Sequence, residues 1–364
     1  MHICVRHFAP FSREVHRGLT LLGPRTPSLA ATTVALLVAR PQAVVAHGQA
    51  PVAPTPAILI EGWSFLVDVW LPVLLLALVY WQMRAGINRR HPDNPVPRIR
   101  LWAWLAGLGV IVLALASPIE FYDTTLFSIH MVQHLLLAFV AAPLLALGAP
   151  ITLLLRWASP EARRRWILPV LESRVVRFIA QPIIAWLLFA LVMWFTHFSP
   201  LFDAALDDFT LHRLEHALYL GTALLFWWPV IGVDPSPHRM SYPGRIMYLA
   251  LGMPLSSLLG LVIFSASTVL YPHYVTLVRD WGPTPLEDQA LAGGIMWAGG
   301  DAVFVLALVL TVAAWLRYEE EENVREDRRL ARARATTTLA AQATPGTVTA
   351  AAAAHEVPPA SSPD

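Results

Sequence analysis

Seven apolar stretches, each of roughly twenty residues, constrain this chain more than any other feature of its sequence. Their approximate limits are 58–83, 101–119, 126–148, 178–199, 212–233, 246–268 and 289–316. At about 1.5 Å of rise per residue, a helix of this length crosses roughly 30 Å of hydrocarbon. The chain is 56% hydrophobic and only 14% charged, which is not typical of a soluble globular protein. We therefore expect an all-α membrane protein with a bundle of seven transmembrane helices over residues 58–316.

The arginines predict how this bundle is oriented. All 26 basic residues are arginines. Five lie in segment 84–100, six in segment 156–177 and six in the tail after residue 316. The alternate connections contain one arginine, Arg279, and several acidic residues. Because arginine-rich connections stay in the cytoplasm, the mature chain is predicted to run with its N-terminus outside and its C-terminus inside.

The two ends differ in composition from the apolar domain. Residues 1–46 combine arginines, an apolar run and a small-residue cleavage pattern at Ala46, which is typical of a secretory signal; without cleavage they would form an N-terminal helix. A short outer segment, 47–57, follows. Residues 317–364 are predicted to be a cytoplasmic tail, largely disordered, in which 319–334 can form a short solvated helix. The single cysteine, Cys4, lies in the signal-like segment, so a metal site must use other ligands.

Two pairs of histidines open the third and fifth apolar stretches. His130 and His134 form one pair, and His212 and His216 form the other. A spacing of four residues places both imidazoles of a pair on one helix face, about 6 Å apart along the axis. His197 ends the fourth stretch at the same, outer surface. The sequence therefore predicts that these five histidines share a metal site at the outer face.

The predicted ligands favour copper, with haem as the alternative. Neutral imidazole binds copper, zinc and iron well. Methionine sulfur, which Cu(I) prefers, has little presence among these residues, so the sequence favours Cu(II) or haem iron over Cu(I). A structural reading also stands, because a single histidine near an interface can simply hydrogen-bond water, headgroups or carbonyl groups.

Four further residues are candidates on separate grounds. His273 lies in a loop on the outer side, and Asp288 opens the seventh stretch from that side. Asp301 lies near the bilayer centre, where it serves either a proton or ion path or a hydrogen bond to a neighbouring helix. His47 would be the first residue after cleavage at Ala46, and its amine and imidazole could then chelate Cu(II).

Several strings resemble a known family. They are His130-Met-Val-Gln-His134, Ala142-Pro143, Gly148-Ala-Pro150, His216-Ala-Leu-Tyr-Leu-Gly-Thr-Ala-Leu-Leu-Phe226-Trp-Trp-Pro229, Tyr271-Pro-His-Tyr274 and Asp288-Gln-Ala-Leu-Ala-Gly-Gly-Ile-Met-Trp297. In this order, over about residues 60–316, they resemble the CtaG family of assembly factors for caa-type cytochrome c oxidase.

The resemblance implies a multi-pass protein of the bacterial plasma membrane that helps to make an active haem-copper oxidase. It implies a part in copper insertion and the oxidase subunits as partners, in addition to the lipid bilayer. It supplies no ligand set, so the metal role of the histidines is inferred from their positions.

Two other functional classes remain open from the residues. A transporter of copper or another small solute would need a polar path past Asp301, and polar residues below the outer histidines are sparse. A haem-bearing electron carrier would use histidines of different helices as axial ligands. The sequence contains no catalytic triad, phosphate loop or paired carboxylates, so we predict no enzyme, and we expect no nucleic-acid partner.

Overall fold

The computed structural model describes residues 53–342, and this part of the chain folds into helices without a strand. Six of its helices are long and apolar enough to cross a membrane, and the number rises to seven if a pair bent by 72° counts as one span. The predicted all-α class with up to seven spans is therefore confirmed. Residues 1–52 and 343–364, which include the whole signal-like segment and His47, lie outside the described residues.

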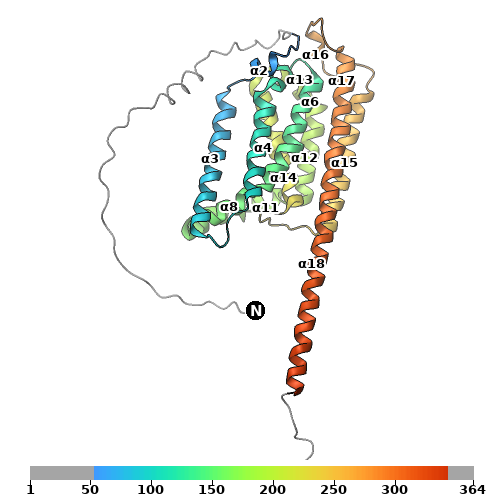
Figure 1. The fold of residues 1–364 in the computed structure, drawn as a ribbon. Coiled ribbons are helices and arrows are strands. Elements are labelled where there is room, and N and C mark those ends of the chain that lie inside the picture. Colours follow the sequence, from blue (N-terminus) through green and yellow to red (C-terminus); the bar gives the residue numbers. More distant parts are fainter. Residues whose placement is uncertain (1–52, 343–364) are drawn as a thin grey trace, which may run out of the picture. The chain divides into compact units, whose positions relative to one another are not determined.

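The helices follow one another with short connections (Figure 1). The first half of the bundle contains α2 (Ile58–Glu61), α3 (Val67–Arg90), α4 (Arg98–Ala116), α5 (Pro118–Tyr122), α6 (Phe127–Leu135), η1 (Leu136–Ala141) and α7 (Ala142–Leu147). A connecting segment contains α8 (Pro150–Trp157), α9 (Pro160–Ala162), η2 (Arg163–Ile167), α10 (Leu168–Leu171) and α11 (Arg174–Ile179). The second half contains α12 (Pro182–His197), α13 (Pro200–Asp207), α14 (Phe209–Ile231), α15 (Tyr242–Ser265), α16 (His273–Thr276), α17 (Pro285–Gly294), η3 (Ile295–Gly299) and α18 (Gly300–Gln342).

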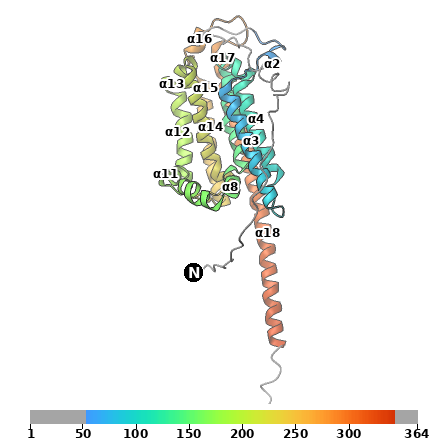
Figure 2. The same ribbon diagram turned by 90° about the vertical axis from the view of Figure 1, so that its left-hand side faces the viewer.

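The described bundle has two distinct ends. At one end, which we call the histidine end, α6, α14 and α17 begin beside α13 and α16 (Figures 1 and 2). At the opposite end, the arginine end, α8 and α11 run beneath the long helices, and α18 continues beyond them. The arginines predicted in segment 156–177 belong to this helical connection. The helix α14 packs against η1 and α7 of the third span and against α12.

The outward faces of the helices suit lipid rather than water. Leu71, Leu74 and Leu78 of α3 are 53%, 59% and 45% exposed. A stripe of this kind on every long helix would be a large apolar patch in an aqueous surrounding, whereas hydrocarbon solvates it without cost. The exposed leucines and the lengths of the helices together indicate a multi-pass membrane protein.

The first span begins later than the sequence predicted. The expected limits were 58–83, and the helix that crosses is α3, Val67–Arg90. The short helix α2 ends before Gly62, and the backbone N–H of Ser64 donates to the carbonyl of Ala116 at 2.9 Å, which holds the chain against the end of α4. The helix continues past Arg84 because a long arginine side chain can extend to the interface while its stem stays apolar.

The third span contains a π-helical turn, η1, between α6 and α7. Pro143 follows it and has no N–H to donate to the preceding turn. The indole Nε1 of Trp227 donates to the carbonyl of Ala138 inside this turn, at 2.9 Å. The turn is thereby tied to α14, the helix that carries the second histidine pair.

The last span has no break where the tail was expected to begin. α18 runs from Gly300 to Gln342, past the predicted boundary at residue 316. Arg325 pairs with Glu321 at 3.0 Å and with Glu322 at 3.2 Å, spacings that support a solvated helix. The first part of the tail is therefore helical, whereas it was expected to be mostly disordered outside 319–334.

Candidate metal centre

A carboxylate from a distant part of the chain caps the helix that carries the first histidine pair. The backbone N–H of Phe127 donates to Oδ2 of Asp288 at 2.6 Å, and the hydroxyl of Ser128 donates to its Oδ1 at 2.5 Å. The first N–H groups of a helix have no partner within it, so an acceptor here stabilises its first turn. Asp288, predicted as a site candidate, thus positions α6.

The second pair lies on α14, whose first turn is capped locally. The backbone N–H of Leu211 donates to Oδ1 of Asp208 at 2.8 Å. From this start, His212 and His216 recur on one face, together with Glu215 and Tyr219, and all four side chains are buried. The helical period therefore places a carboxylate and a phenol on the same face as the imidazoles.

The two pairs meet in the interior of the histidine end. The ring centroids are 4.2 Å apart for His130 and His134 and 4.4 Å apart for His212 and His216. Across the helices, His130 lies 5.2 Å from His212, and His134 lies 5.5 Å from His216. All four side chains are buried. Residues that are 82 positions apart in sequence thus form one group, which we call the histidine cluster.

Three of the four histidines in the cluster have ring nitrogens without a hydrogen-bond partner among the described residues. In the described part of the chain, neither ring nitrogen of His130, His134 or His216 has a hydrogen-bond partner. A buried polar atom without a partner costs about 1–3 kcal/mol, and this cost is removed when the nitrogen binds a cation or water. One potential ligand atom from each of His130, His212 and His216 lies within 4.8 Å of the others, a separation that a shared ion can bridge.

His197 lies at the edge of the cluster, with its ring 6.1 Å from that of His134. Its Nδ1 lies 2.7 Å from the carbonyl of Met193. Because a carbonyl only accepts, this nitrogen carries the proton, and Nε2 keeps its lone pair. Nε2 has no partner among the described residues. A histidine held in one tautomer by a carbonyl is the usual preparation of a metal ligand.

Glu215 lies beside the histidine cluster and was not among the predicted site residues. It is buried, and neither of its carboxylate oxygens has a hydrogen-bond partner within the described chain. One of its oxygens and one nitrogen each of His130 and His134 all lie within 4.8 Å of one another. The available signal was its position three residues after His212, which places it on the histidine face of α14.

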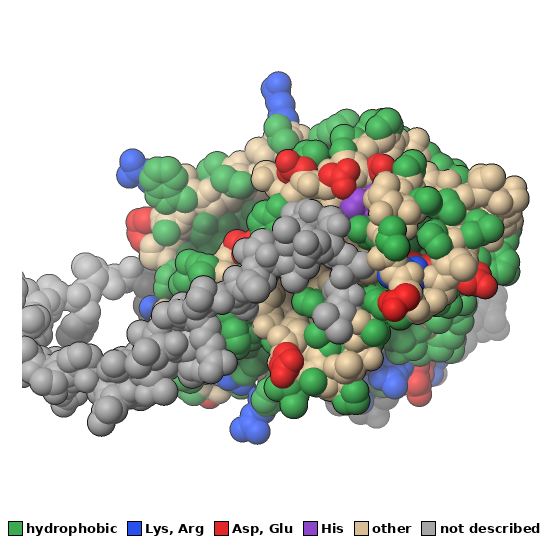
Figure 3. All heavy atoms as spheres, turned by 90° about the horizontal axis from the view of Figure 1, so that it is seen from above, with side chains coloured by type: hydrophobic (Ala, Val, Ile, Leu, Met, Phe, Trp, Pro, Cys, Tyr) green, Lys and Arg blue, Asp and Glu red, His purple; other side chains and the backbone are tan. Residues whose placement is uncertain are grey.

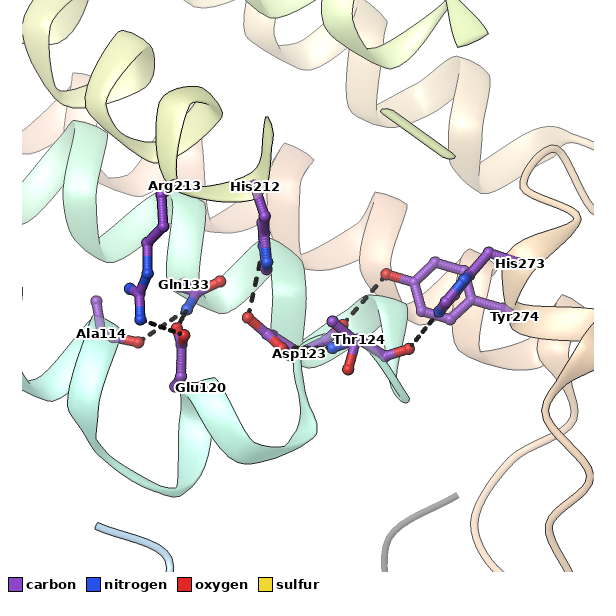
Figure 4. Close-up of polar contacts among 9 residues, drawn as sticks. All are labelled: Ala114, Glu120, Asp123, Thr124, Gln133, His212, Arg213, His273 and Tyr274. Atoms are coloured by element: carbon purple, nitrogen blue, oxygen red, sulfur yellow. Dashed lines mark hydrogen bonds and ion pairs between the residues drawn. The ribbon is translucent and has the colours of Figure 1, made fainter. Parts of the chain in front are cut away.

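An acidic group lies behind His212 (Figure 4). Oδ2 of Asp123 is 3.6 Å from Nε2 of His212. Burial raises the pKa of Asp123 well above its usual range, and the nearby charge of Glu120 raises it further. Glu120 itself pairs with Arg213 at 3.1 Å and accepts a hydrogen bond from Nε2 of Gln133 at 2.7 Å.

Arg213 also contacts Asp68 of α3, with its Nε 3.3 Å from Oδ2. The guanidinium thus joins α14 to the start of α3 and the end of α5. These charges hold the α14 end of the cluster in place, and none of them was among the predicted site residues.

The sequence model of the family described as cytochrome c oxidase caa3 assembly factor matches residues 76–318, which is more than half of the chain. The chain belongs to this family. The matched range contains all five histidines of the predicted site, Glu215, and the carboxylates of Asp123, Asp208 and Asp288.

Three mycobacterial relatives of this family member are known as uncharacterised proteins. Those of Mycobacterium bovis and Mycobacterium tuberculosis are each 34% identical over 285 residues, which cover 76% of this chain and 43% of the relative. That of Mycobacterium leprae is 29% identical over 273 residues, covering 73% of this chain and 41% of the relative. The chain thus spans about two fifths of the length of the curated relatives it matches. No solved structure matches it.

His273, a predicted candidate, is not part of the histidine cluster. Its Nδ1 is 2.7 Å from Oδ1 of Asp207, and its Nε2 is 2.9 Å from the carbonyl of Thr124. Both ring nitrogens of His273 therefore have a polar partner. Beside it, the hydroxyl of Tyr274 donates to the carbonyl of Asp123 at 3.2 Å (Figure 4). These contacts join α16 to the end of α13 and to the loop that precedes α6.

Asp301 lies on α18, away from the cluster. Its Oδ1 accepts a hydrogen bond from the hydroxyl of Ser257 on α15 at 2.6 Å. Two roles were predicted for Asp301, a hydrogen bond to a neighbouring helix and a part in a proton or ion path. The contact with Ser257 is a hydrogen bond of the first kind. The part of Asp301 in an ion path stays a prediction, as does the role of His47.

The surface of the histidine end carries acidic side chains between apolar ones (Figure 3). Acidic residues at this end include Asp203, Asp207 and Asp208 of the α13 region. Exposed carboxylates attract cations, so this surface favours the approach of a metal ion over that of an anion.

Proposed function

We propose that this chain is a non-enzymatic assembly factor for haem-copper cytochrome c oxidase, which holds a copper ion transiently in the histidine cluster and passes it to an oxidase subunit. The observation that carries the proposal is the group of buried imidazoles in which neither ring nitrogen of His130, His134 or His216 has a hydrogen-bond partner in the described chain. Family membership supports the assembly role.

The donor set fits copper as a cargo. Imidazole is a good ligand for copper in either oxidation state, and the described cluster contains no thiolate that would bind the ion too firmly to release it. His130, His212 and His216 would hold the ion, since their potential ligand atoms lie within 4.8 Å of one another. His197, with its fixed tautomer, would assist from the edge. A small set of neutral ligands binds the ion weakly enough for its release, and transfer to another protein requires such release.

We place the chain in the bacterial plasma membrane with its histidine end outside. The reasons are the arginine-rich connection α8–α11 at the other end and the acidic surface at this one. Residues 1–46 would direct the N-terminus outward, and residues 317–364 would lie in the cytoplasm. Copper would then be received and delivered on the outer side, by contact with oxidase subunits within the bilayer.

The first experiment measures the metal content and visible absorption of the detergent-purified protein. Wild type is compared with a variant that combines His130→Ala, His134→Ala, His212→Ala and His216→Ala. The matched control combines His91→Ala and His238→Ala, which removes histidines outside the cluster. Both variants are checked for a monodisperse elution profile.

The proposal expects about one copper per chain in wild type and control, and its loss from the cluster variant. A Soret band that disappears in the cluster variant would replace the copper assignment with haem. If copper-loaded wild type retains neither copper nor haem, the metal role of the cluster is refuted, and the family relation alone remains.

The assembly role needs a separate test in cells. Deleting the gene is expected to lower the copper content and activity of the membrane oxidase while its polypeptides are still made. Restoring wild type recovers both, and restoring the cluster variant does not. Full oxidase activity without the chain would overturn the assembly role.

A further inference from the structure

Glu215 presents a problem that the three-histidine set does not solve. Its carboxylate is only 7% exposed, and neither oxygen has a hydrogen-bond partner among the described residues. An ionised carboxylate in such surroundings is costly unless a cation lies beside it. Arg213, two residues away, already contacts Glu120 and Asp68 at 3.1 and 3.3 Å.

The contacts around Glu215 define a second set of possible ligands. One set consists of His130, His212 and His216, and the other consists of His130, His134 and Glu215. In each set the ligand atoms lie within 4.8 Å of one another. His130 belongs to both. The two sets are therefore neighbouring positions, one made only of imidazoles and one that includes a carboxylate.

Charge distinguishes the ions that these positions suit. Three neutral imidazoles around Cu(I) form a complex with a single positive charge, whereas a divalent ion there keeps two positive charges in a low-dielectric interior. Exchanging one imidazole for the Glu215 carboxylate returns a divalent complex to a single charge. Carboxylate oxygen is also a harder ligand than imidazole nitrogen and favours divalent ions.

We propose that His130, His134 and Glu215 form a position selective for a divalent ion, next to the all-histidine position of His130, His212 and His216, which takes Cu(I). Because His130 is shared, the two positions are alternatives for one ion. The inference rests on the proposed function, since it assumes that the cluster binds metal. It adds that the cluster distinguishes the charge of the ion and that Glu215 is the residue responsible.

The test compares Glu215→Gln with wild type in the full-length, detergent-purified chain. Affinity for Zn(II) is measured by competition with a chromogenic chelator in air, and affinity for Cu(I) with a Cu(I)-specific chelator under anaerobic, reducing conditions. The matched control is Glu61→Gln, the same substitution at an exposed residue of α2 at the histidine end. His212→Gln is the reciprocal variant.

Glu215→Gln is expected to weaken Zn(II) binding about tenfold or more and to leave Cu(I) binding within about twofold. Loss of an outer-shell partner of a metal ligand already costs about 10–100-fold in affinity, so loss of a ligand should cost at least about tenfold. His212→Gln is expected to weaken Cu(I) binding more than Zn(II) binding. Glu61→Gln changes neither. The electron paramagnetic resonance spectrum of Cu(II) added to the protein is expected to change in Glu215→Gln and to stay constant in Glu61→Gln.

Equal losses for both ions in Glu215→Gln, or no loss for either, would overturn the second position while leaving copper binding by the cluster intact. If wild type binds neither Zn(II) nor Cu(I), the proposed function fails, and this inference fails with it. Should Glu215→Gln not elute as folded protein, His134→Gln tests the same position, because it removes another ligand of that set only.

Discussion

Asp288 holds the first turn of α6 although it lies 161 residues from Phe127, whose N–H it accepts. Asp288 is 1% exposed, so water contributes little to its charge, and the groups that it binds stabilise it. The cluster thus depends on a side chain outside it, since α6 carries His130 and His134. Asp208 does the same for α14 from an exposed position next to the helix.

The two caps should differ in strength. We expect Asp288→Ala to lower the free energy of unfolding by about 2–3 kcal/mol, because it removes hydrogen bonds to a buried charge. Asp208→Ala should cost about 1 kcal/mol, as for an exposed N-cap. Thermal unfolding in detergent measures both, and Asp288→Ala should also weaken copper retention. Equal effects of the two substitutions would argue against a special role for the buried cap.

Tyr274 offers a second test at the level of a residue. Burial raises the pKa of its hydroxyl above the ordinary value, so the folded chain holds the phenolic proton more tightly than the unfolded chain, in which tyrosine has a pKa of about 10. The stability linked to this proton is complete below that pH and is lost as the pH rises above it.

We therefore expect Tyr274→Phe to lose less thermal stability than wild type between about pH 8 and pH 11, because it has no proton to release. At the lower pH the variant should be slightly less stable, since its hydrogen bond to the carbonyl of Asp123 is gone. Tyr318→Phe, at an exposed position of α18, is the control. A wild-type loss no greater than that of Tyr274→Phe would contradict this account.

Among the elements, α15 and α17 approach each other most closely through glycine. A Cβ added to Gly293 would lie 2.5 Å from the backbone N of Phe264, and one added to Gly260 would lie 2.8 Å from the carbonyl of Gly293. Such distances exclude any side chain. The close contact fixes the start of the last span, and with it Asp288 and the cap of α6.

Gly293→Ala is therefore expected to destabilise the protein by about 1–3 kcal/mol through overpacking. Gly221→Ala, on α14, has no atom within 4 Å of the added Cβ, so it should be neutral or stabilising by up to about 1 kcal/mol, as expected from helix propensity. Thermal unfolding in the same detergent compares the pair. If both variants unfold like wild type, the backbone contact is less rigid than the distances indicate.

The elements also differ in how far sequence patterns could reveal them. Apolar length is sufficient to predict a span in a bilayer, and all seven predicted stretches overlap a helix. It does not predict where a span begins when apolar residues continue into a loop, as they do from Ile58 to Leu66. Here the start of the span is set by Gly62 and by the hydrogen bond from Ser64 to the carbonyl of Ala116. Ala116 is 52 residues further along the chain, so a local pattern cannot reveal this contact.

At the scale of the whole molecule, the histidine pairs were predictable because helical spacing and loop charge place them at one end. Glu215 was not predicted, because a glutamate near a helix start is ordinarily solvated, whereas here it is buried beside His130 and His134 of α6. The actual roles of Asp288 and His273 depend on contacts with residues more than 60 positions away. Local sequence patterns do not predict contacts between residues so far apart in the chain.

The orientation of the whole chain can be tested with two reporters. We expect a fluorescent protein fused after Arg334 to be fluorescent and alkaline phosphatase fused there to be inactive, because that position would lie in the cytoplasm. Inserted between Gly282 and Pro283, at the histidine end, the same two reporters should give the opposite result. Active phosphatase after Arg334 would invert the topology and place the cluster on the cytoplasmic side.

α18 has 43 residues in an unbroken helix. At 1.5 Å per residue such a helix is about 65 Å long, roughly twice the hydrocarbon thickness of a bilayer. A straight helix fixes direction as well as distance, since each residue adds a turn of about 100°. One residue inserted beyond the bundle would therefore swing every later side chain to a different side, whereas seven would restore the original side about 10 Å further out. The direction of the far end of α18, and the side to which each of its residues points, thus depend on how the start of the last span is packed. The contact between Gly293 and Gly260 fixes that packing.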